Sequence, residues 1–353
     1  MAFTQITRSF DQGKTFVNNE FLSTLRLFFI VGRGRSGTTL LRQMLDAHPN
    51  LLVAPEALFI MNLYHKYSRI VKWNHKKVDD FCDDLLLEKR LEDWNLDEIS
   101  LKQQLHALGS NVPFPEINKL VYANYAFVNR KPDTTLLGDK NPHYSLFIDK
   151  LMKLYPDSKY IHMVRDYRDN ILSYKDVKFD LNNTAALAYR WKKYNKTILK
   201  YSKRYPDQFF LLKYEDLVTK PDECLHSICV FLGVDFNPVM LQFYQFQHST
   251  SKFVWHKNIS KPLDKTRLDK WKTKMQQSDV IKSDYICKHV AEFFGYENSY
   301  NNRNSPYLFV LTLPGVIFAW FFTLLEKLVF FLPIRIRSKI ITIYRVITGS
   351  LDL

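Results

Sequence analysis

The chain has 353 residues, of which 46% are hydrophobic and 24% are charged. This balance is typical of a folded globular protein and excludes a chain that is disordered beyond its termini. The 50 Lys and Arg residues outnumber the 36 Asp and Glu residues, which gives a formal net charge of +14. The charge indicates an anionic partner such as a nucleotide, a nucleic acid, an acidic glycan or an anionic membrane. The alternative is a basic surface that is only exposed to solvent and binds no partner.

The first predicted unit covers residues 26–55 and consists of a strand, a glycine-rich loop and a helix. Residues 27–31 are a continuous apolar run, and residues 38–47 repeat apolar side chains with the period of a helix. The loop between them, residues 32–39, has the sequence GRGRSGTT. In such a unit the backbone N–H groups at the helix start converge on a phosphate, so we expect half of a nucleotide-binding site here.

This loop departs from the loop of nucleoside triphosphate enzymes at one position. Gly32 and Gly37 fit the pattern GxxxxGK[ST], but Thr38 stands where that pattern has its lysine. Arg35 instead places a planar cation inside the loop, and Thr38 and Thr39 supply hydroxyl and amide donors at the helix start. These residues suit the oxygens of a phosphosulfate. The alternative is a glycine-rich turn with capping threonines.

Residues 57–130 contain helical patterns rich in charged and aromatic residues, and we expect a helical lid or acceptor-binding insertion there. Strands and helices then alternate again: a helix at 146–155, a strand at 159–164, a helix from about 168 to 173 or beyond, a helix at 187–205 and a strand at 208–213. Such alternation predicts parallel strands covered by helices. The expected fold class is α/β, a three-layer parallel sheet of the P-loop type flanked by helices.

The end of the chain differs in kind. Residues 307–325 contain no charged residue, and a second apolar run at 328–334 leads into a segment with several Lys and Arg residues. This pattern predicts a hydrophobic helical tail at 306–353 that associates with an anionic membrane surface, behind a catalytic domain at 1–305. Pro314 and Gly315 interrupt the run and favour a re-entrant hairpin. The alternative is a buried pair of terminal helices.

Four cysteines, at positions 82, 224, 229 and 287, show neither paired CxxC spacing nor histidines at the spacing of a zinc site. We expect reduced core residues and no metal. The first 16 residues lack the apolar run of a secretory signal. A bacterial, cytoplasmic location at the inner face of the membrane is therefore expected.

Residues 31–56, VGRGRSGTTLLRQMLDAHPNLLVAPE, resemble the 5′-phosphosulfate-binding loop of sulfotransferases, above all the tyrosylprotein sulfotransferase branch with its PRSGTTL and LDAHP segments. Gly34 stands where that branch has proline. The resemblance implies 3′-phosphoadenosine 5′-phosphosulfate as the sulfuryl donor. It assigns donor contacts to the loop, namely Arg33, Gly34, Arg35, Ser36, Gly37, Thr38 and Thr39.

A second segment, residues 160–174, YIHMVRDYRDNILSY, resembles the strand and helix that bind the donor 3′-phosphate in the same family. The resemblance implies that Arg165 and Ser173 hold that phosphate, whereas alone Arg165 is an ordinary surface ion-pairing residue. Two shorter pieces agree with the family: LLKYEDLV at 211–218, which includes Tyr214, and HKNISKP at 256–262, where Ser260 and Lys261 lie in a loop that closes over the donor.

Sulfuryl transfer requires a base for the attacking hydroxyl and cations for the leaving group. Glu56 follows His48 by eight residues, as the catalytic glutamate follows the LDAHP segment in the family, and Lys140 in Gly-Asp-Lys-Asn-Pro resembles the lysine that stabilises the sulfuryl oxygens. Arg35 shares the charge of the leaving diphosphate. His48 and His143 are the alternative bases.

Two other functions remain open from the sequence. One is a P-loop kinase, which would need a loop lysine and an acidic magnesium ligand that this sequence does not show in place. The other is a non-catalytic membrane-attached nucleotide-binding protein. For the sulfotransferase, the expected acceptor is a hydroxyl of a lipophilic, sterol-like or lipid molecule, or of a glycan, with no nucleic acid partner. The acidic peptides of the tyrosylprotein branch are disfavoured because the chain shows no entry signal to a secretory compartment.

Overall fold

The computed structural model describes residues 19–128, 131, 133–177, 182–246, 261–300 and 305–348. Its centre is one parallel sheet with the strand order β2-β3-β1-β4-β5. The strands are β1 (Arg26–Gly32), β2 (Leu51–Ala54), β3 (Leu136–Lys140), β4 (Lys159–Val164) and β5 (Phe209–Lys213). The α/β prediction is confirmed, and the strands expected at 27–31, 159–164 and 208–213 are β1, β4 and β5.

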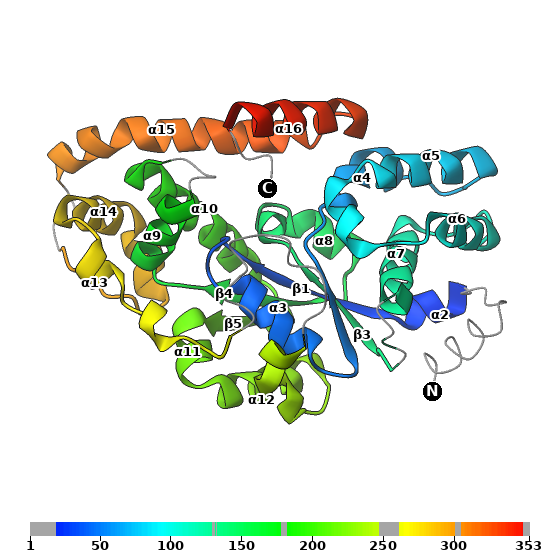
Figure 1. Ribbon diagram of the computed structural model, residues 1–353. Coiled ribbons are helices and arrows are strands. Elements are labelled where there is room, and N and C mark those ends of the chain that lie inside the picture. The colour runs from blue at the N-terminus through cyan, green and yellow to red at the C-terminus, as the bar shows by residue number, and fades with distance from the viewer. Residues whose placement is uncertain are drawn as a thin grey trace.

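Helices cover both faces of this sheet, which gives three layers (Figure 1). The sheet strands are apolar at successive positions because both faces are buried. In β1, Phe29 and Val31 face the core shared with the helices of the insertion, whereas Phe28 and Ile30 face the core on the opposite side, with α3 (Thr38–Asp46) and α12 (Pro221–Leu232). A third buried cluster joins α9 (Tyr167–Val177), α10 (Thr184–Ser202) and α14 (Gln277–Phe293).

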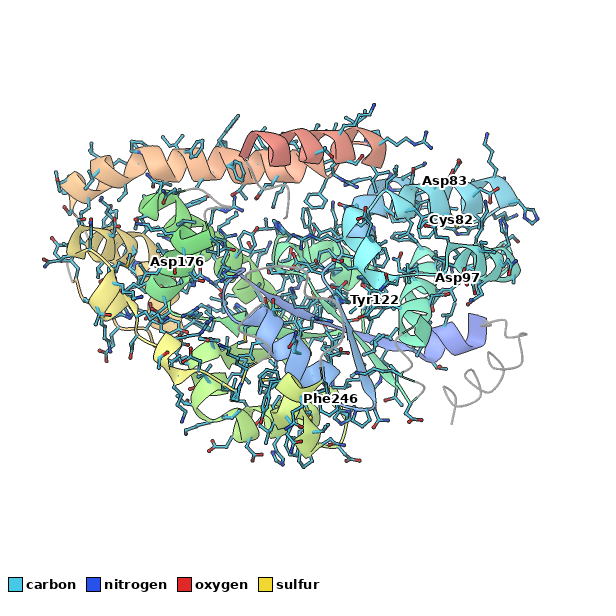
Figure 2. The ribbon with its side chains drawn as sticks, in the orientation of Figure 1. Cys82, Asp83, Asp97, Tyr122, Asp176 and Phe246 are labelled. Atoms are coloured by element: carbon cyan, nitrogen blue, oxygen red, sulfur yellow. The ribbon has the colours of Figure 1, made fainter. Side chains whose placement is uncertain are left out.

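The remaining elements connect and cover these layers. The segment 57–130 contains helices throughout most of its length, as its sequence pattern predicts: α4 (Phe59–Tyr67), α5 (His75–Leu86), the 3-10 helix η1 (Lys89–Trp94), α6 (Glu98–Ala107) and α7 (Phe114–Val128). The other helices are α2 (Asn19–Thr24), η2 (Pro142–Leu146), α8 (Ile148–Leu154), η3 (Pro206–Gln208), α11 (Tyr214–Thr219), η4 (Pro238–Gln245), η6 (Lys265–Arg267) and α13 (Trp271–Lys274). Three of the four cysteines are buried and all four are free thiols, including Cys82 on α5 (Figure 2).

The C-terminal segment forms two helices, α15 (Pro306–Val329) and α16 (Ile334–Thr348), which both run along one side of the molecule, at the top of Figure 1. The expected hairpin at Pro314 is wrong, because Pro314 lies inside the continuous helix α15. Gly315 has a packing role instead of a turn role: a Cβ atom there would lie 2.5 Å from Asn183 Oδ1 and 2.9 Å from Ala185 Cβ. The glycine therefore lets α15 approach the start of α10 closely.

The alternative of a buried terminal helix pair is also wrong. Only Leu308, Thr312, Ala319 and Thr323 of α15 are buried. The helix is long and apolar enough to cross a membrane, with a mean hydropathy of 2.3 over its most apolar 18 residues. Most of its large apolar side chains are exposed.

Candidate active site

The residues expected to carry the chemistry all follow the carboxyl ends of the parallel strands. Loop residues 33–37 follow β1, Glu56 follows β2, Lys140 ends β3, Arg165 follows β4 and Tyr214 follows β5. In an open parallel sheet these ends lie on one edge, which is where ligands bind in α/β folds. The topology thus brings residues that are more than 150 positions apart in the chain into one region.

The loop after β1 has an unusual backbone that two residues permit. Arg35 has φ 63° and Gly37 has φ 92°, both in the left-handed region. A Cβ atom on Gly37 would lie 2.4 Å from Tyr214 Cδ2, so only glycine fits against this tyrosine. Asn170 on α9 fixes the loop from behind, because its Nδ2 donates to the Gly34 carbonyl oxygen at 2.8 Å and to Ser36 Oγ at 3.1 Å.

A cationic cavity lies in front of this loop. Its walls come from the loop, from the ends of β4 and β5 and from a late segment of the chain: Arg35, Gly37, Thr38, Thr39, Leu40, Arg165, Ser173, Tyr214, Val218, Lys261, Pro262, Leu263, Asp264 and Arg267. Eight of the residues predicted to bind the donor are among them. The two sequence segments that resemble the 5′- and 3′-phosphate sites thus form opposite sides of one cavity.

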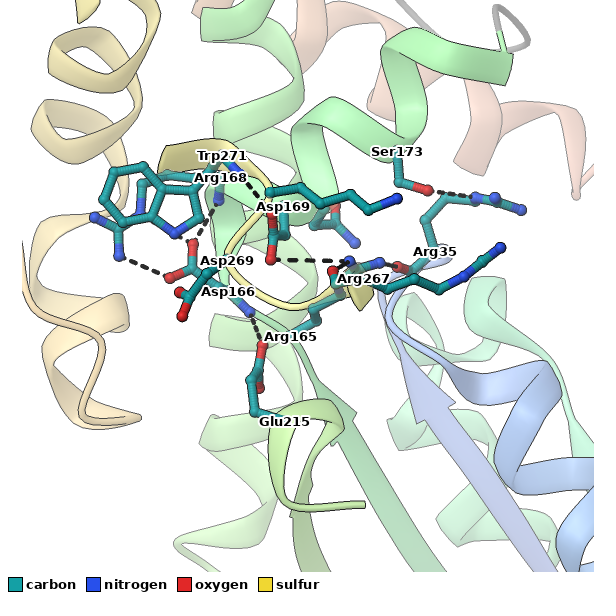
Figure 3. Close-up of polar contacts among 12 residues, drawn as sticks. Arg35, Arg165, Asp166, Arg168, Asp169, Ser173, Glu215, Arg267, Asp269 and Trp271 are labelled. Carbon is teal, nitrogen blue, oxygen red and sulfur yellow. Dashed lines mark hydrogen bonds and ion pairs between the residues drawn. The ribbon is translucent and has the colours of Figure 1, made fainter. Parts of the chain in front are cut away.

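Hydrogen bonds tie the two sides of the cavity together (Figure 3). Arg35 Nε donates to Ser173 Oγ at 3.0 Å, and Arg165 Nη2 donates to the Arg267 carbonyl oxygen at 2.8 Å. The Arg165 guanidinium also lies over the Tyr214 ring, 4.5 Å from its centroid. Burial, helped by the nearby charges of Arg165 and Arg267, lowers the pKa of Arg35. An anion between these cations would relieve that repulsion.

Not every predicted donor contact lines the cavity. Arg33 is turned away from it, with its guanidinium over the rings of Tyr174 and Tyr194 at 4.1 and 4.9 Å. Gly34 and Ser36 belong to the loop, but they do not line the cavity. They accept hydrogen bonds from Asn170 instead. Ser260 lies outside the described residues. Donor contacts by these four residues remain predictions.

Glu56 and Lys140 meet at the same edge of the sheet. Lys140 Nζ lies 2.7 Å from Glu56 Oε2, and Arg90 Nη1 from the insertion lies 2.6 Å from Glu56 Oε1. The Lys140 side chain is 5% exposed, against 20% for Glu56 and 37% for Arg90. The carboxylate is therefore held between two cations, one buried and one partly exposed.

The environment keeps Glu56 ionised. Burial raises the pKa of Glu56, but the charges of Arg90 and Lys140 outweigh burial and hold this pKa well below the usual range of a glutamate. Burial lowers the pKa of Lys140, and the neighbouring carboxylate opposes this shift. An ionised carboxylate can accept a proton, although a lowered pKa weakens it as a base while both cations stay in place.

The β2–β3 register explains why this pair forms. Ala54 pairs with Asp139, so Glu56 and Lys140 leave the sheet side by side. Asn141 then bridges the two strands, since its Nδ2 donates to the Ala57 carbonyl oxygen at 3.0 Å and also to Asp139 Oδ1.

Asp139 anchors the same strand to the insertion. Tyr122 on α7, labelled in Figure 2, donates a hydrogen bond to the other Asp139 oxygen. Burial raises the pKa of Asp139 to about 7, while its hydrogen bonds with Tyr122 and Asn141 oppose the shift. This buried network fixes the strand end that carries Lys140.

The two alternative bases occupy different positions. Both ring nitrogens of His48 are engaged by backbone: Nδ1 accepts from the Asn50 N–H at 3.0 Å, and Nε2 lies 2.8 Å from the Asp235 carbonyl oxygen. The ring is 3% exposed. His143 lies nearer to Glu56, with Nδ1 3.5 Å from the Tyr194 hydroxyl, and burial lowers its pKa. His48 thus connects segments of the chain, whereas His143 borders the site.

Comparison with known proteins decides the family. A sequence model of the sulfotransferase family matches residues 28–238, more than half of the chain. The chain belongs to this sulfotransferase family. The matched region begins in β1 and ends near η4, so it includes the loop, the Glu56–Lys140 pair and the Arg165 and Tyr214 walls of the cavity.

Relatives and solved structures agree with this assignment. The sulfotransferase is 24% identical over 289 residues to protein-tyrosine sulfotransferase 1 of Danio rerio, covering 79% of this chain and 74% of the relative. A putative protein-tyrosine sulfotransferase of Caenorhabditis briggsae is 24% identical over 62% of this chain and 70% of its own length.

Among solved structures, the sulfotransferase domain of the Synechococcus PCC 7002 olefin synthase matches with a TM-score of 0.54 and 29% identity, over 77% of this chain and 95% of that domain. The sulfotransferase domain of the curacin biosynthetic pathway matches with a TM-score of 0.52 and 26% identity, over 77% and 98%. These structures share the fold over most of the present sulfotransferase.

The structure adds site residues that the sequence did not reveal. Arg90 pairs with Glu56, Asn170 holds the loop, and Arg267 lines the cavity beside Arg165. Asn170 lies within the segment 160–174, whose resemblance to the family could have indicated it. Arg90 and Arg267 carry no local signal, because only the packing of the insertion and of the late segment brings them to the sheet edge. Within the described part of the chain, no three His, Cys, Asp or Glu side chains are grouped as a metal site.

Proposed function

We propose that this sulfotransferase transfers a sulfuryl group from 3′-phosphoadenosine 5′-phosphosulfate to a hydroxyl of a lipophilic, sterol-like or lipid acceptor, or of a glycan. The observation that supports the proposal is that the Glu56–Lys140 pair lies at the same edge of the sheet as the cavity that Arg35, Ser173 and Arg165 line. One edge of the sheet thus carries a proton acceptor, a cation and further cations for a doubly phosphorylated nucleotide. We infer a bacterial enzyme at the cytoplasmic face of the membrane.

The donor fits the chemistry of the cavity. Arg165 and Ser173 would hold the 3′-phosphate, while Arg35 and the N–H groups of Thr38 and Thr39 at the start of α3 would hold the 5′-phosphosulfate. Lys261 and Arg267 add cations from the late segment. Arg267 is partly neutralised by Asp264, whose Oδ2 lies 3.2 Å from Arg267 Nε.

In the transfer, the acceptor oxygen forms a bond to sulfur while the bond between sulfur and the 5′-phosphate oxygen breaks. Glu56 takes the proton of the acceptor hydroxyl, and Lys140 stabilises the sulfuryl oxygens. Arg35 stabilises the negative charge that collects on the leaving 3′-phosphoadenosine 5′-phosphate. Glu56 is preferred to His48 as the base because both His48 nitrogens are already engaged by backbone.

The test follows radiolabelled sulfate from the donor into pooled lipid, sterol, oligosaccharide and tyrosine-peptide acceptors. We expect label in the lipid, sterol or oligosaccharide pool, lost in Glu56→Gln and Lys140→Ala but kept in the control Glu297→Gln, which changes an exposed carboxylate. Label in the peptide pool alone would replace the proposed acceptor class with that of the protein-tyrosine relatives. No label in any pool despite tight binding of the desulfated donor would favour a non-catalytic nucleotide-binding protein.

A further inference from the structure

Helix α15 has two sides of unlike character. Its buried residues Leu308, Thr312, Ala319 and Thr323 recur every four or seven positions and form one stripe, which faces α10. On the other sides, eleven large apolar residues of α15 are more than a third exposed, among them Val310 at 67% and Trp320 at 54%. Soluble monomers rarely leave a continuous apolar surface of this length open to water.

The same surface continues along α16. Phe331, Ile336 and Ile340 are exposed, and the basic residues Arg335 and Lys339 stand beside the two isoleucines at the same four-residue spacing. We call the exposed side chains of α15 and α16, from Tyr307 to Ile340, the outer face. It combines an apolar ridge with basic residues at one end.

The outer face lacks acidic charge. The one acidic residue of the sequence 305–348 is Glu326. It turns toward the protein, where its Oε1 lies 2.8 Å from Arg190 Nη2 on α10. Arg335 lies 4.0 Å from Asp84 of α5, but the exposed charged side chains described on α15 and α16 themselves are cations. Such a surface complements the interface of a bilayer that contains anionic lipids.

Contacts on the inner side fix the orientation of these helices. Crossing a bilayer would pull α15 away from α10, break the Glu326 pair and uncover Arg190, whose side chain is 2% exposed. At the junction with α16, Phe330 packs on Phe147 with ring centroids 4.8 Å apart, and Arg337 Nη2 donates to the Asn62 carbonyl oxygen at 3.2 Å. Both helices are therefore held along the body of the protein, as Figure 1 shows.

We propose that the outer face lies in the interfacial layer of a bilayer with anionic lipids, with α15 and α16 parallel to the membrane plane. The protein is thereby attached to one side of the membrane without crossing it. Amphipathic helices bind in this way when their apolar side enters the region between headgroups and acyl chains.

This orientation also bears on the acceptor, a step that rests on the proposed function. Two side chains of α10 connect α15 to the catalytic residues: Arg190, which pairs with Glu326, lies 5.9 Å from the Tyr194 ring, and the Tyr194 hydroxyl lies 3.5 Å from His143 Nδ1. His143 lies three residues after Lys140, whose Nζ is 2.7 Å from Glu56 Oε2. The base therefore lies on the membrane side of the molecule, and the structure favours an alcohol that resides in the bilayer.

The first experiment measures binding of the full-length chain to sedimented vesicles of phosphatidylcholine alone or with phosphatidylglycerol. We expect binding to both and tighter binding to the anionic vesicles. Replacing exposed aromatics, Phe318→Asp with Phe321→Asp, should weaken binding at least tenfold. The control Val230→Asp, at an exposed apolar position on α12, should leave it unchanged.

The basic residues are tested in the same assay. The double variant Arg335→Gln, Lys339→Gln should bind anionic vesicles roughly fivefold more weakly for each charge removed. Its affinity for neutral vesicles should change little. Affinity for the desulfated donor, measured without vesicles, reports whether each variant is folded. No binding of the native chain to either vesicle, or a solution dimer whose formation is abolished by Phe318→Asp, would overturn the proposal.

A second experiment separates an in-plane from a crossing helix. Lys339→Cys is bound to preformed vesicles and treated with a membrane-impermeant maleimide, with the native chain as the background for Cys224, the one thiol that is not buried. In-plane helices leave Cys at position 339 on the outside and labelled, whereas a crossing α15 would carry it inside and protect it. Sulfuryl transfer to alcohols embedded in vesicles is assayed separately. If the protein binds vesicles but transfers no sulfuryl group to these alcohols, the proposal of a bilayer-resident acceptor is overturned, whereas membrane binding through the outer face stands.

Discussion

Arg90 sets the protonation of the proposed base, and the structure gives the size of its effect. Its Nη1 lies 2.6 Å from Glu56 Oε1, with about 4 Å between the charge centres, which corresponds to roughly 4 kcal/mol at an effective dielectric constant of about 20. Arg90 is 37% exposed, and solvent reduces the interaction several-fold, to about 1.4 kcal/mol. Arg90→Gln should therefore raise the pKa of Glu56 by about one unit.

The assay is the pH dependence of kcat/KM, which reports the ionisation of the base in the free enzyme. Since the pKa of Glu56 is held below its usual range, the acid limb of the native enzyme should lie below about pH 4. Arg90→Gln should move the limb to higher pH by about one unit, and Arg90→Lys should leave it near its native position. The control Arg204→Gln changes an exposed arginine and should not move it. An unchanged limb in Arg90→Gln, or one at lower pH, would refute the assignment of Glu56 as the base.

Three further changes probe the rest of the site. Lys140→Ala should lower kcat by about 10²- to 10³-fold with little change in the affinity for 3′-phosphoadenosine 5′-phosphate, because its cation acts on the transferring group. Arg165→Ala should weaken binding of that nucleotide by about 1.5–3 kcal/mol but leave binding of adenosine 5′-phosphate, which lacks the 3′-phosphate, almost unaltered in calorimetry. Gly37→Ala should abolish donor binding and lower the melting temperature, because its Cβ would lie 2.4 Å from Tyr214 and its φ is 92°.

Gly37→Ala has a matched control at another glycine with a positive φ. Gly233→Ala, with φ 74° and only Arg26 Nη1 at 3.8 Å from the new Cβ, isolates the backbone strain of about 1 kcal/mol, and donor binding should survive it. Equal loss of both nucleotides in Arg165→Ala would mean that Arg165 does not hold the 3′-phosphate. A large fall in nucleotide affinity in Lys140→Ala would place that lysine in donor binding.

The C-terminal segment shows how a local signal was misleading. Pro314 followed by Gly315 predicts a turn, because neither residue favours a helix interior. In the structure the close approach of α15 to Asn183 and Ala185 requires a residue without Cβ, and the packing keeps the helix continuous. A Pro-Gly pair has the same sequence whether it forms a turn or lies in a helix that packs closely on another helix. Only the surface against which the segment packs decides between the two structures.

Strand β3 shows a second limit of predicting structure from local sequence. Residues 136–140, LLGDK, are short, contain a glycine and end in two charges, so no strand was expected there. In the sheet β3 lies between β1 and β2, and a Cβ on Gly138 would lie 2.5 Å from Phe28 Cζ. Its conformation depends on neighbours more than 80 residues away, which local propensity does not describe.

The sequence by itself determined the parts of this protein whose physics is local. A buried strand followed by a glycine-rich turn and a helix start specifies an anion-binding loop wherever it occurs, and the segment around Arg165 carries its strand and helix within fifteen residues. Tertiary structure alone decided which side chains meet there: Arg90 on Glu56, Arg267 beside Arg165, and Arg190 under α15. These contacts join residues far apart in the chain, and their energies depend on burial and distance, which exist only after the elements have packed.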